Sequence, residues 1–140
     1  MKRKLFYVIP MLAGIVTACS QSLVSTDYDA SLCEELSMRI ERRDSLSQDD
    51  YARMIGQNEA ILKYLVEQTK KISEEPDSVR GASWRLLTAE PEYLERFGYM
   101  FTIGSALYSA QLDGMLDKNN LKNYEKLDKY NDELIEYTDR

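Results

Sequence analysis

The chain has 140 residues, the length of one domain, and it contains 18 Lys and Arg against 24 Asp and Glu, a net charge of −6 at pH 7. This acidic balance argues against binding to nucleic acid, which requires clustered Lys and Arg. The sequence has no histidine, which excludes Ser-His-Asp catalysis, His-ligated zinc and the Glu-x-x-His di-iron sites of helical bundles.

The first nineteen residues are arranged like an export signal. Lys2, Arg3 and Lys4 form a positive segment, and an apolar run from Leu5 to Val16 follows. Small residues then precede a cysteine in Val16-Thr17-Ala18-Cys19. The segment resembles the signal peptide of bacterial lipoproteins, whose lipobox ends in cysteine, and the resemblance covers residues 1–19 only. An ordinary secretory signal is the alternative, because Ala18 would suit that peptidase too, and the apolar run is too short for an uncleaved membrane anchor.

The resemblance implies cleavage before Cys19, with a diacylglycerol thioether on its sulfur and an acyl chain, such as palmitate, on its new amine. Residues 1–18 are then the signal peptide, 19–27 a lipidated tether and 28–140 a helical domain. Two or more acyl chains hold a protein stably on a bilayer, at ~0.8 kcal/mol per buried CH₂. Ser20, in place of the Asp that retains many lipoproteins at the inner membrane, favours the periplasmic side of the outer membrane. Loss of Lys2, Arg3 and Lys4 leaves 15 basic against 24 acidic residues, a net charge of −9.

The first predicted helix has Asp27 as its N-cap and runs to about Arg43. Apolar residues recur every four positions, at Leu32, Leu36 and Ile40. This spacing indicates an amphipathic helix with one buried stripe. With Cys19 lipidated, Cys33 has no partner for an intramolecular disulfide, so we expect a buried thiol, with an intermolecular disulfide as the alternative.

The second predicted helix starts at Ser47, which with Asp50 forms a capping box. Its apolar positions follow 3- and 4-residue steps: Met54, Ile55, Ile61, Leu62, Leu65, Val66 and Ile72. Asn58 falls on the same stripe. We expect it to be a hydrogen-bonded member of the core or to lie at the stripe's edge, with a functional role as the alternative.

Two further helices are predicted, from Val79 to Thr88 and from Pro91 to about Leu116. The inner face expected for the first consists of Val79, Ala82, Ser83, Leu86 and Leu87. The second contains sixteen uncharged residues, Phe97 to Leu112, too short and too polar for a membrane span. We expect this segment to be the central, largely buried helix. Its small residues would let a neighbouring helix approach closely: Gly98, Gly104, Ser105, Ala106, Ser109 and Ala110.

A turn at residues 117–120 precedes the last predicted helix. On its helical wheel Leu127 and Leu134 point inward, and Tyr130 and Tyr137 fall roughly 60° to the side. Their rings should be half exposed beside two acids, Glu133 and Glu136. Such an aromatic surface with an acidic border could bind a basic, partly apolar partner. The alternative is that both tyrosines only cover the edge of the core.

No stretch alternates at period two for long enough to form a strand, so the predicted fold is all-α, a compact bundle of four to five helices. We expect no enzyme, no cofactor and no metal site. Adjacent carboxylates such as Glu34 and Glu35 diverge on a helix, and Asp117-x-Asn119 continues with Leu121 where a calcium loop needs a ligand.

The expected function is a non-catalytic interaction module, either an accessory subunit of an envelope complex or an immunity-type inhibitor of a basic envelope protein. The alternative is a carrier of a small ligand. It would use a cavity beside the small-residue face of Gly104, Ala106 and Ala110, and a cavity lined by Met100 and Tyr108 would favour it.

Substitution of the predicted lipidation site provides a test of the anchor. Cys19→Ala should abolish labelling of the protein by a fatty-acid probe and release it into the soluble fraction, because the acyl chains can no longer be attached. The measurement is fractionation of cell envelopes with immunodetection. A mutant protein that stays membrane-bound to the same degree as wild type would contradict lipid anchoring.

Overall fold

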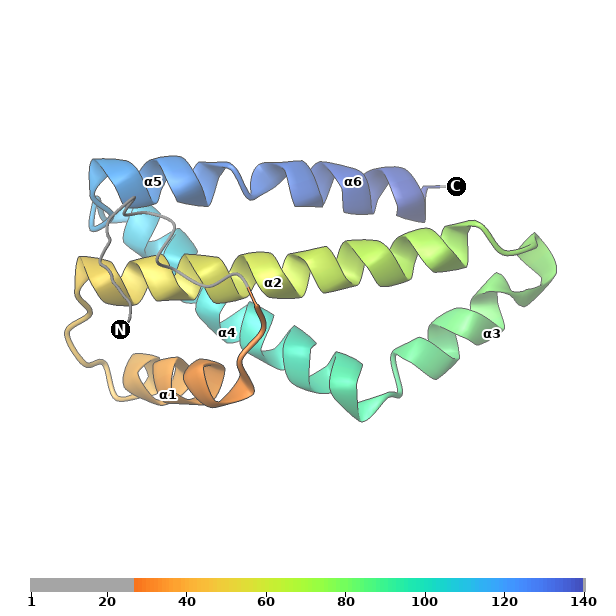
Figure 1. The fold of residues 1–140 in the computed structure, drawn as a ribbon, viewed down its shortest axis with the longest axis horizontal. Coiled ribbons are helices and arrows are strands. Elements are labelled where there is room, and N and C mark those ends of the chain that lie inside the picture. Colours follow the sequence, from red (N-terminus) through yellow and green to blue (C-terminus); the bar gives the residue numbers. More distant parts are fainter. Residues whose placement is uncertain (1–26, 140) are drawn as a thin grey trace, which may run out of the picture.

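The computed structural model of the chain describes residues 27–139, which form an all-α bundle (Figure 1). The helices are α1 (Ala30–Glu41), α2 (Gln48–Ser73), α3 (Asp77–Leu87), α4 (Pro91–Leu112), α5 (Lys118–Glu125) and α6 (Asp128–Thr138). α5 and α6 lie end to end in one line, where the sequence predicted a single last helix. The predicted all-α bundle is confirmed. The signal peptide and Cys19 lie outside the described residues.

The helix ends follow from local sequence. Ser47 and Asp50 form the predicted capping box of α2, and Pro91 is the first residue of α4. Asp29, rather than the predicted Asp27, caps α1 by accepting a hydrogen bond from the Leu32 backbone N–H. α4 ends at Leu112, earlier than predicted, because Gly114 follows with a φ of +68°, a left-handed conformation that stops a helix and suits glycine.

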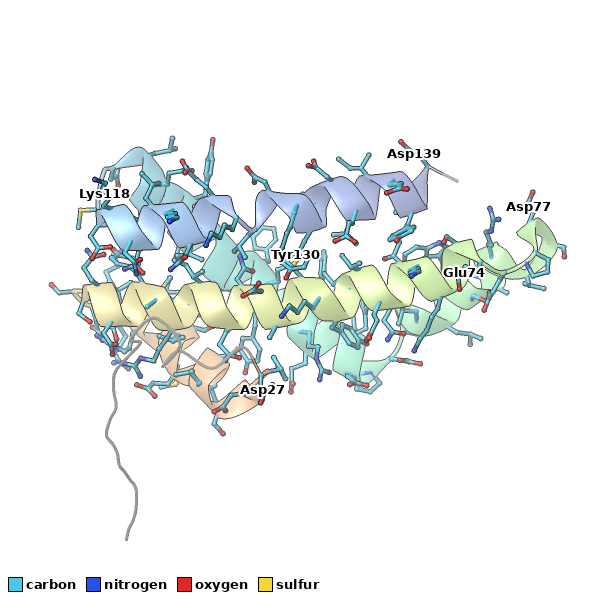
Figure 2. All side chains as sticks on the ribbon, turned by 45° about the horizontal axis from the view of Figure 1, so that its top comes forward. Asp27, Glu74, Asp77, Lys118, Tyr130 and Asp139 are labelled. Carbon is cyan, nitrogen blue, oxygen red and sulfur yellow. The ribbon has the colours of Figure 1, made fainter. Side chains whose placement is uncertain are left out.

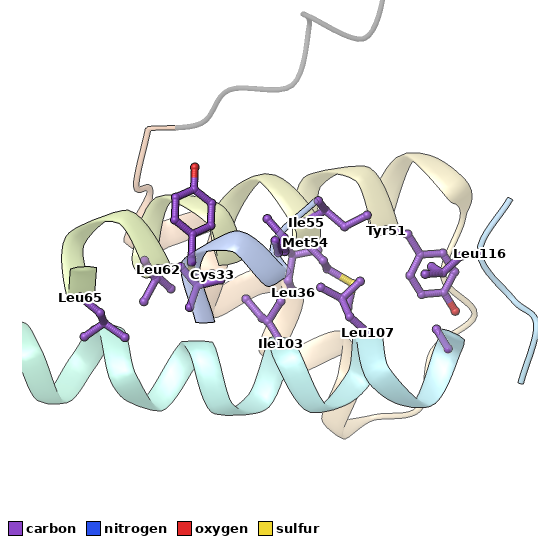
Figure 3. Close-up of a cluster of buried hydrophobic side chains, with 14 residues drawn as sticks. Cys33, Leu36, Tyr51, Met54, Ile55, Leu62, Leu65, Ile103, Leu107 and Leu116 are labelled. Atoms are coloured by element: carbon purple, nitrogen blue, oxygen red, sulfur yellow. The ribbon is translucent and has the colours of Figure 1, made fainter. Parts of the chain in front are cut away.

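The central element of the bundle is α2, so the predicted central position of α4 is wrong. α2 packs against each of the other five helices, and α1 also packs on α4. The fully buried apolar side chains come from α1, α2 and α4: Cys33, Leu36, Met54, Ile61, Ile103 and Leu107 (Figure 3). In α4 only Ile103, Leu107 and Ala110 are buried. Its neighbours cover one side of this helix, and the other side faces solvent.

Two polar side chains of α2 hold the chain at both ends of α1. The Gln57 Nε2 donates to the Asp27 carbonyl at 3.0 Å, and its Oε1 accepts from the Asp29 N–H at 2.8 Å and from the Cys33 thiol at 3.4 Å. Cys33 is buried, as predicted, and burial raises the pKa of its thiol to about 12. At the other end of α1, Asp50 accepts from Arg39 Nη1 at 2.8 Å.

A third polar side chain of α2 holds the start of α5. Gln48 Nε2 donates to the Met115 carbonyl at 2.7 Å. Its Oε1 accepts from the Asp117 N–H at 2.9 Å and from Asn120 Nδ2 at 2.8 Å. Asn120 is buried, so these bonds satisfy polar groups that would otherwise be costly to bury.

α3 extends from the far end of α2, beyond the turn between Glu74 and Asp77 (Figure 2). Its buried side chain is Leu87, and Ser83 and Trp84 are partly covered. Three residues of the predicted inner face are exposed instead: Val79, Ala82 and Leu86. The rotation of α3 is set by Glu75, whose carboxylate accepts from the Ser83 hydroxyl and whose carbonyl accepts from Arg80 Nε at 2.9 Å.

The hydrogen bonds of Asp50 predict that part of the folding stability is lost at low pH. Burial by itself raises the pKa of this carboxyl group, but hydrogen bonds from Arg39 and Ser47 outweigh burial, so its pKa lies below the ordinary value. Because the pKa of Asp50 is lower in the folded state, the carboxylate stabilises the fold at pH values above the unfolded-state pKa of ~3.9. This contribution is lost as the pH falls from that value through the lower pKa of the folded state.

Asp50→Asn should therefore lower the free energy of unfolding by about 1.5–3 kcal/mol at pH 7, because hydrogen bonds to a charged group are lost. Urea unfolding of wild type and mutant between pH 7 and pH 2 provides the measurement. The difference between the two proteins should shrink below about pH 4. A difference that stays constant with pH would show that the carboxylate charge is not what stabilises the α1–α2 junction.

Candidate functional site

The tyrosine site predicted on the last helix does not form as expected. Tyr130 is only 7% exposed, its ring lies between α6 and α2, and its hydroxyl donates to Glu59 Oε2 at 2.8 Å (Figure 2). Burial and this hydrogen bond raise the pKa of Tyr130 to about 12. The predicted half exposure of Tyr130 is wrong because α6 packs along α2 and covers that side of the helix. Partner binding by the three remaining residues stays a prediction: Glu133 and Tyr137 are partly buried and Glu136 is exposed.

The largest exposed apolar side chains gather on α4 instead. They are Leu94, Phe97, Phe101, Tyr108, Leu112 and, just beyond the helix end, Met115. Steps of 3, 4, 7 and 4 residues place the first five on one face of the helix. Phe101 is 69% exposed and Leu112 is 68% exposed. We call these six side chains the α4 ridge; the sequence analysis missed it because the uncharged segment was expected to be covered on all sides.

The rotation of α4 that exposes the ridge is held by Arg96. Its guanidinium carbon lies 4.3 Å from the centre of the Tyr28 ring and 4.6 Å from that of Tyr64. Its Nη1 also lies 2.6 Å from Glu92 Oε2. Tyr28 donates to Glu95 Oε1 at 2.7 Å, and burial together with this bond raises the pKa of Tyr28. Arg96 is thus placed between α2 and the start of the helical domain, where cation–π contacts fix one side of α4.

The surroundings of the α4 ridge are acidic. From Glu90 to Asp117 the sequence has five acidic residues, Glu90, Glu92, Glu95, Asp113 and Asp117, and a single basic one, Arg96. The five acids are exposed and lie before and after the uncharged segment 97–112. Because Arg96 is already paired with Glu92 and stacked on two tyrosines, the charge offered at both ends of the ridge is negative.

A groove of about 470 Å³ lies beside the ridge, between α4 and the line of α5 and α6. Its walls come from four elements and the α5–α6 break: Asn58, Leu62, Met100, Phe101, Gly104, Ser105, Tyr108, Ser109, Tyr124, Leu127, Asp128 and Asn131. The cavity expected for the ligand-carrier alternative is present at Gly104, Met100 and Tyr108 as this groove, but Ala106 and Ala110 do not line it. We call it the Asn58 groove.

Gly104 and Asn58 face each other in this groove. A Cβ atom at residue 104 would lie 3.7 Å from Asn58 Nδ2 and 3.8 Å from Asn58 Oδ1. Gly104 therefore meets a side-chain amide and the groove, whereas the sequence predicted the close approach of a neighbouring helix. Asn58 is 6% exposed and its Oδ1 has no hydrogen-bond partner. It lines the groove, so of the two placements that the sequence predicted it takes the one at the edge of the apolar stripe.

Within residues 27–139 no group of three or more Cys, Asp or Glu side chains is placed to hold a metal ion. No helix in the same range is long and apolar enough to cross a membrane. The chain matches no protein-family model, no curated protein and no solved structure. Function therefore has to be argued from the α4 ridge and the Asn58 groove themselves.

The hydrogen bond between Tyr130 and Glu59 predicts how removal of the Tyr130 hydroxyl changes the stability of the fold. Tyr130→Phe should lower the free energy of unfolding by about 1 kcal/mol, because the ring still packs but the hydrogen bond to Glu59 is lost. Chemical denaturation compares the variant with wild type, and Tyr108→Phe, on an exposed ring, serves as the control with no expected change. Equal stability of all three proteins would mean that the Tyr130 hydroxyl is solvated, as the helical wheel suggested.

Proposed function

We propose that the protein is a non-catalytic interaction module, lipid-anchored through Cys19 on the periplasmic side of the outer membrane, that binds a partner protein with the α4 ridge. The observation that supports this function is the ridge itself: six large exposed apolar side chains, five of them on one helix face. Large apolar side chains exposed together on one side of an element mark interaction sites, whereas scattered single ones are normal on soluble proteins. The aromatic members, Phe97, Phe101 and Tyr108, are residue types enriched at protein interfaces.

Charge indicates the kind of partner. The acids from Glu90 to Glu95 and at Asp113 and Asp117 border the ridge, and the mature chain as proposed carries a net charge of −9. An apolar surface surrounded by Lys and Arg would place opposite charges around a desolvated centre, which speeds association and selects the partner. A basic envelope protein with an apolar patch is therefore the occupant that we propose.

A second copy of this chain fits the ridge less well. The ridge spacing reads the same in both directions, so two α4 helices could pair antiparallel with matching apolar positions. That pairing would bring Glu92 and Glu95 of one copy opposite Asp113 and Asp117 of the other. Like charges placed together across an interface are repulsive, whereas a basic partner removes the repulsion.

The bilayer surface is also a poorer occupant than a basic protein. Helices that lie on membranes carry Lys and Arg on the polar face, which attract anionic lipid headgroups. The acids that border the α4 ridge would be repelled by such headgroups. The eight residue steps from Cys19 to Asp27 span at most about 28 Å, so the tether would keep the helical domain near the membrane surface and near other envelope proteins.

Site-specific photocrosslinking in living cells tests this proposal. Benzoylphenylalanine is introduced in place of Leu112 on the ridge or, as the matched control, in place of Leu86, which is 71% exposed on α3 and lies off the ridge. We expect an adduct with another protein from position 112 and none from position 86. Mass spectrometry of the adduct should show a protein with a basic surface.

Three outcomes would contradict the proposed occupant: an adduct between two copies of this chain, adducts with lipid only, or equal adducts from both positions. Charge is tested separately with Asp113→Lys, which keeps the ridge and adds a base next to the α4 C-terminus, where it also suits the helix dipole. Its adduct yield should fall several-fold, and rising salt should reduce the wild-type yield. An adduct yield that changes neither with Asp113→Lys nor with rising salt would exclude a basic partner.

A further inference from the structure

We propose that the Asn58 groove is a binding site for a small aromatic amide, with the ring held by the apolar walls and the amide paired with the side chain of Asn58. The inference does not depend on the partner proposed above. Three observations at one place support it: the unpaired Oδ1 of Asn58, a glycine at residue 104 and a groove with the volume of a small-molecule site.

The unpaired group stands out against its neighbours on α2. Gln48, Asp50, Gln57 and Glu59 are polar, and each accepts a hydrogen bond from another part of the fold. Asn58 lies between Gln57 and Glu59 and is 6% exposed, but its Oδ1 has no hydrogen-bond partner. A buried acceptor without a partner costs stability, and it is retained where something else satisfies it.

The other unpaired buried atoms in residues 27–139 do not point to a ligand in this groove. Arg53 Nε and Arg96 Nε belong to guanidinium groups whose other nitrogens form ion pairs. Ser37 Oγ is on α1 and does not line the Asn58 groove. Asn58 alone among the four lines this groove.

Gly104 is the glycine that lines the groove opposite Asn58. Its φ angle is not in the left-handed region, and an added Cβ would meet Asn58 only at ordinary contact distances of 3.7 and 3.8 Å. Neither backbone conformation nor a close helix contact therefore requires glycine here. What glycine does is keep a side chain out of the groove beside the Asn58 amide, in the middle of a helix where alanine would be more favourable.

The walls of the groove indicate the rest of the ligand. Leu62, Met100 and Leu127 offer apolar surface, and Phe101, Tyr108 and Tyr124 offer rings. Aromatic side chains and methionine both make favourable contacts with an aromatic ring. A volume of about 470 Å³ falls in the usual range for sites of small molecules and is far more than one water molecule needs.

The amide of Asn58 selects the polar part of the ligand. It carries one acceptor, Oδ1, and one donor group, Nδ2, and rotation by half a turn exchanges the two. A ligand amide also carries one donor and one acceptor, so it can satisfy both ends of the Asn58 side chain in either orientation. Small hydrocarbons of the same shape would leave Oδ1 unpaired.

Benzamide and toluene are the probes that test this site. Full-length protein in lipid nanodiscs, with ¹⁵N in its asparagines, is titrated by NMR with each compound. We expect benzamide to shift the Asn58 side-chain resonances saturably, with a Kd of about 1 mM or lower, as fits a ligand of this size. Toluene should bind at least about tenfold more weakly. No saturable shift at Asn58 with benzamide up to about 10 mM would overturn the proposal.

Gly104→Ala and Gly98→Ala distinguish an effect on ligand binding in the groove from an effect on the stability of the fold. Both replace a helical glycine of α4, but a Cβ at Gly98 has no atom within 4 Å, whereas one at Gly104 enters the groove. Both variants should raise the Tm, by about 2–5 °C, through helix propensity. Only Gly104→Ala should weaken benzamide binding, by about tenfold or more. Equal binding by the two variants would show that the shifts come from another site.

Asn58→Leu tests the hydrogen bonds. It replaces the amide with an apolar side chain of similar shape and removes the unpaired acceptor, so the fold should be at least as stable as wild type. The affinity of this variant for benzamide should fall to the level of its affinity for toluene. If benzamide keeps its advantage over toluene in this variant, the Asn58 amide does not recognise the ligand.

Discussion

The polar side chains along α2 are the constraint on which the arrangement of the other helices depends. Gln57 holds the chain before α1, Asp50 holds the end of α1, Gln48 holds the start of α5, and Glu59 holds α6. Apolar contacts permit sliding and rotation at modest cost, whereas a hydrogen bond is lost when either partner moves, at a cost of about 1–3 kcal/mol where the group left unpaired is buried. These bonds therefore select one register on α2 for α1, α5 and α6.

α4 is held differently, and its exposed face follows from that difference. No hydrogen bond from the polar side chains named above reaches it; its buried residues Ile103, Leu107 and Ala110 and the stacked Arg96 keep one side against the bundle. A helix with a broad apolar surface, covered on one side only, must expose the remainder. The exposed remainder is the α4 ridge, on which the proposed partner function depends.

The ridge and the Asn58 groove are neighbours with two side chains in common. Phe101 and Tyr108 belong to the ridge and also line the groove. A protein seated on the ridge would contact the same rings that a ligand in the groove contacts. If both proposals hold, occupation of one site changes the surface presented to the other, and the two affinities are coupled in both directions.

The sequence by itself determined what depends on neighbouring residues. The all-α class, the capping box of Ser47 and Asp50, Pro91 at the start of α4 and the burial of Cys33 were all predicted. Capping and helical periodicity are local properties, and a stripe of apolar residues already defines a face to be covered. Periodicity does not say which element covers a face, or whether any does. Only the tertiary structure therefore decided that α2 is central, that α6 buries Tyr130 and that Phe101 is exposed. It also decided that Asn58, on the same apolar stripe as its buried neighbours, lines a groove with its oxygen unpaired, because the other walls of that groove come from residues distant in sequence.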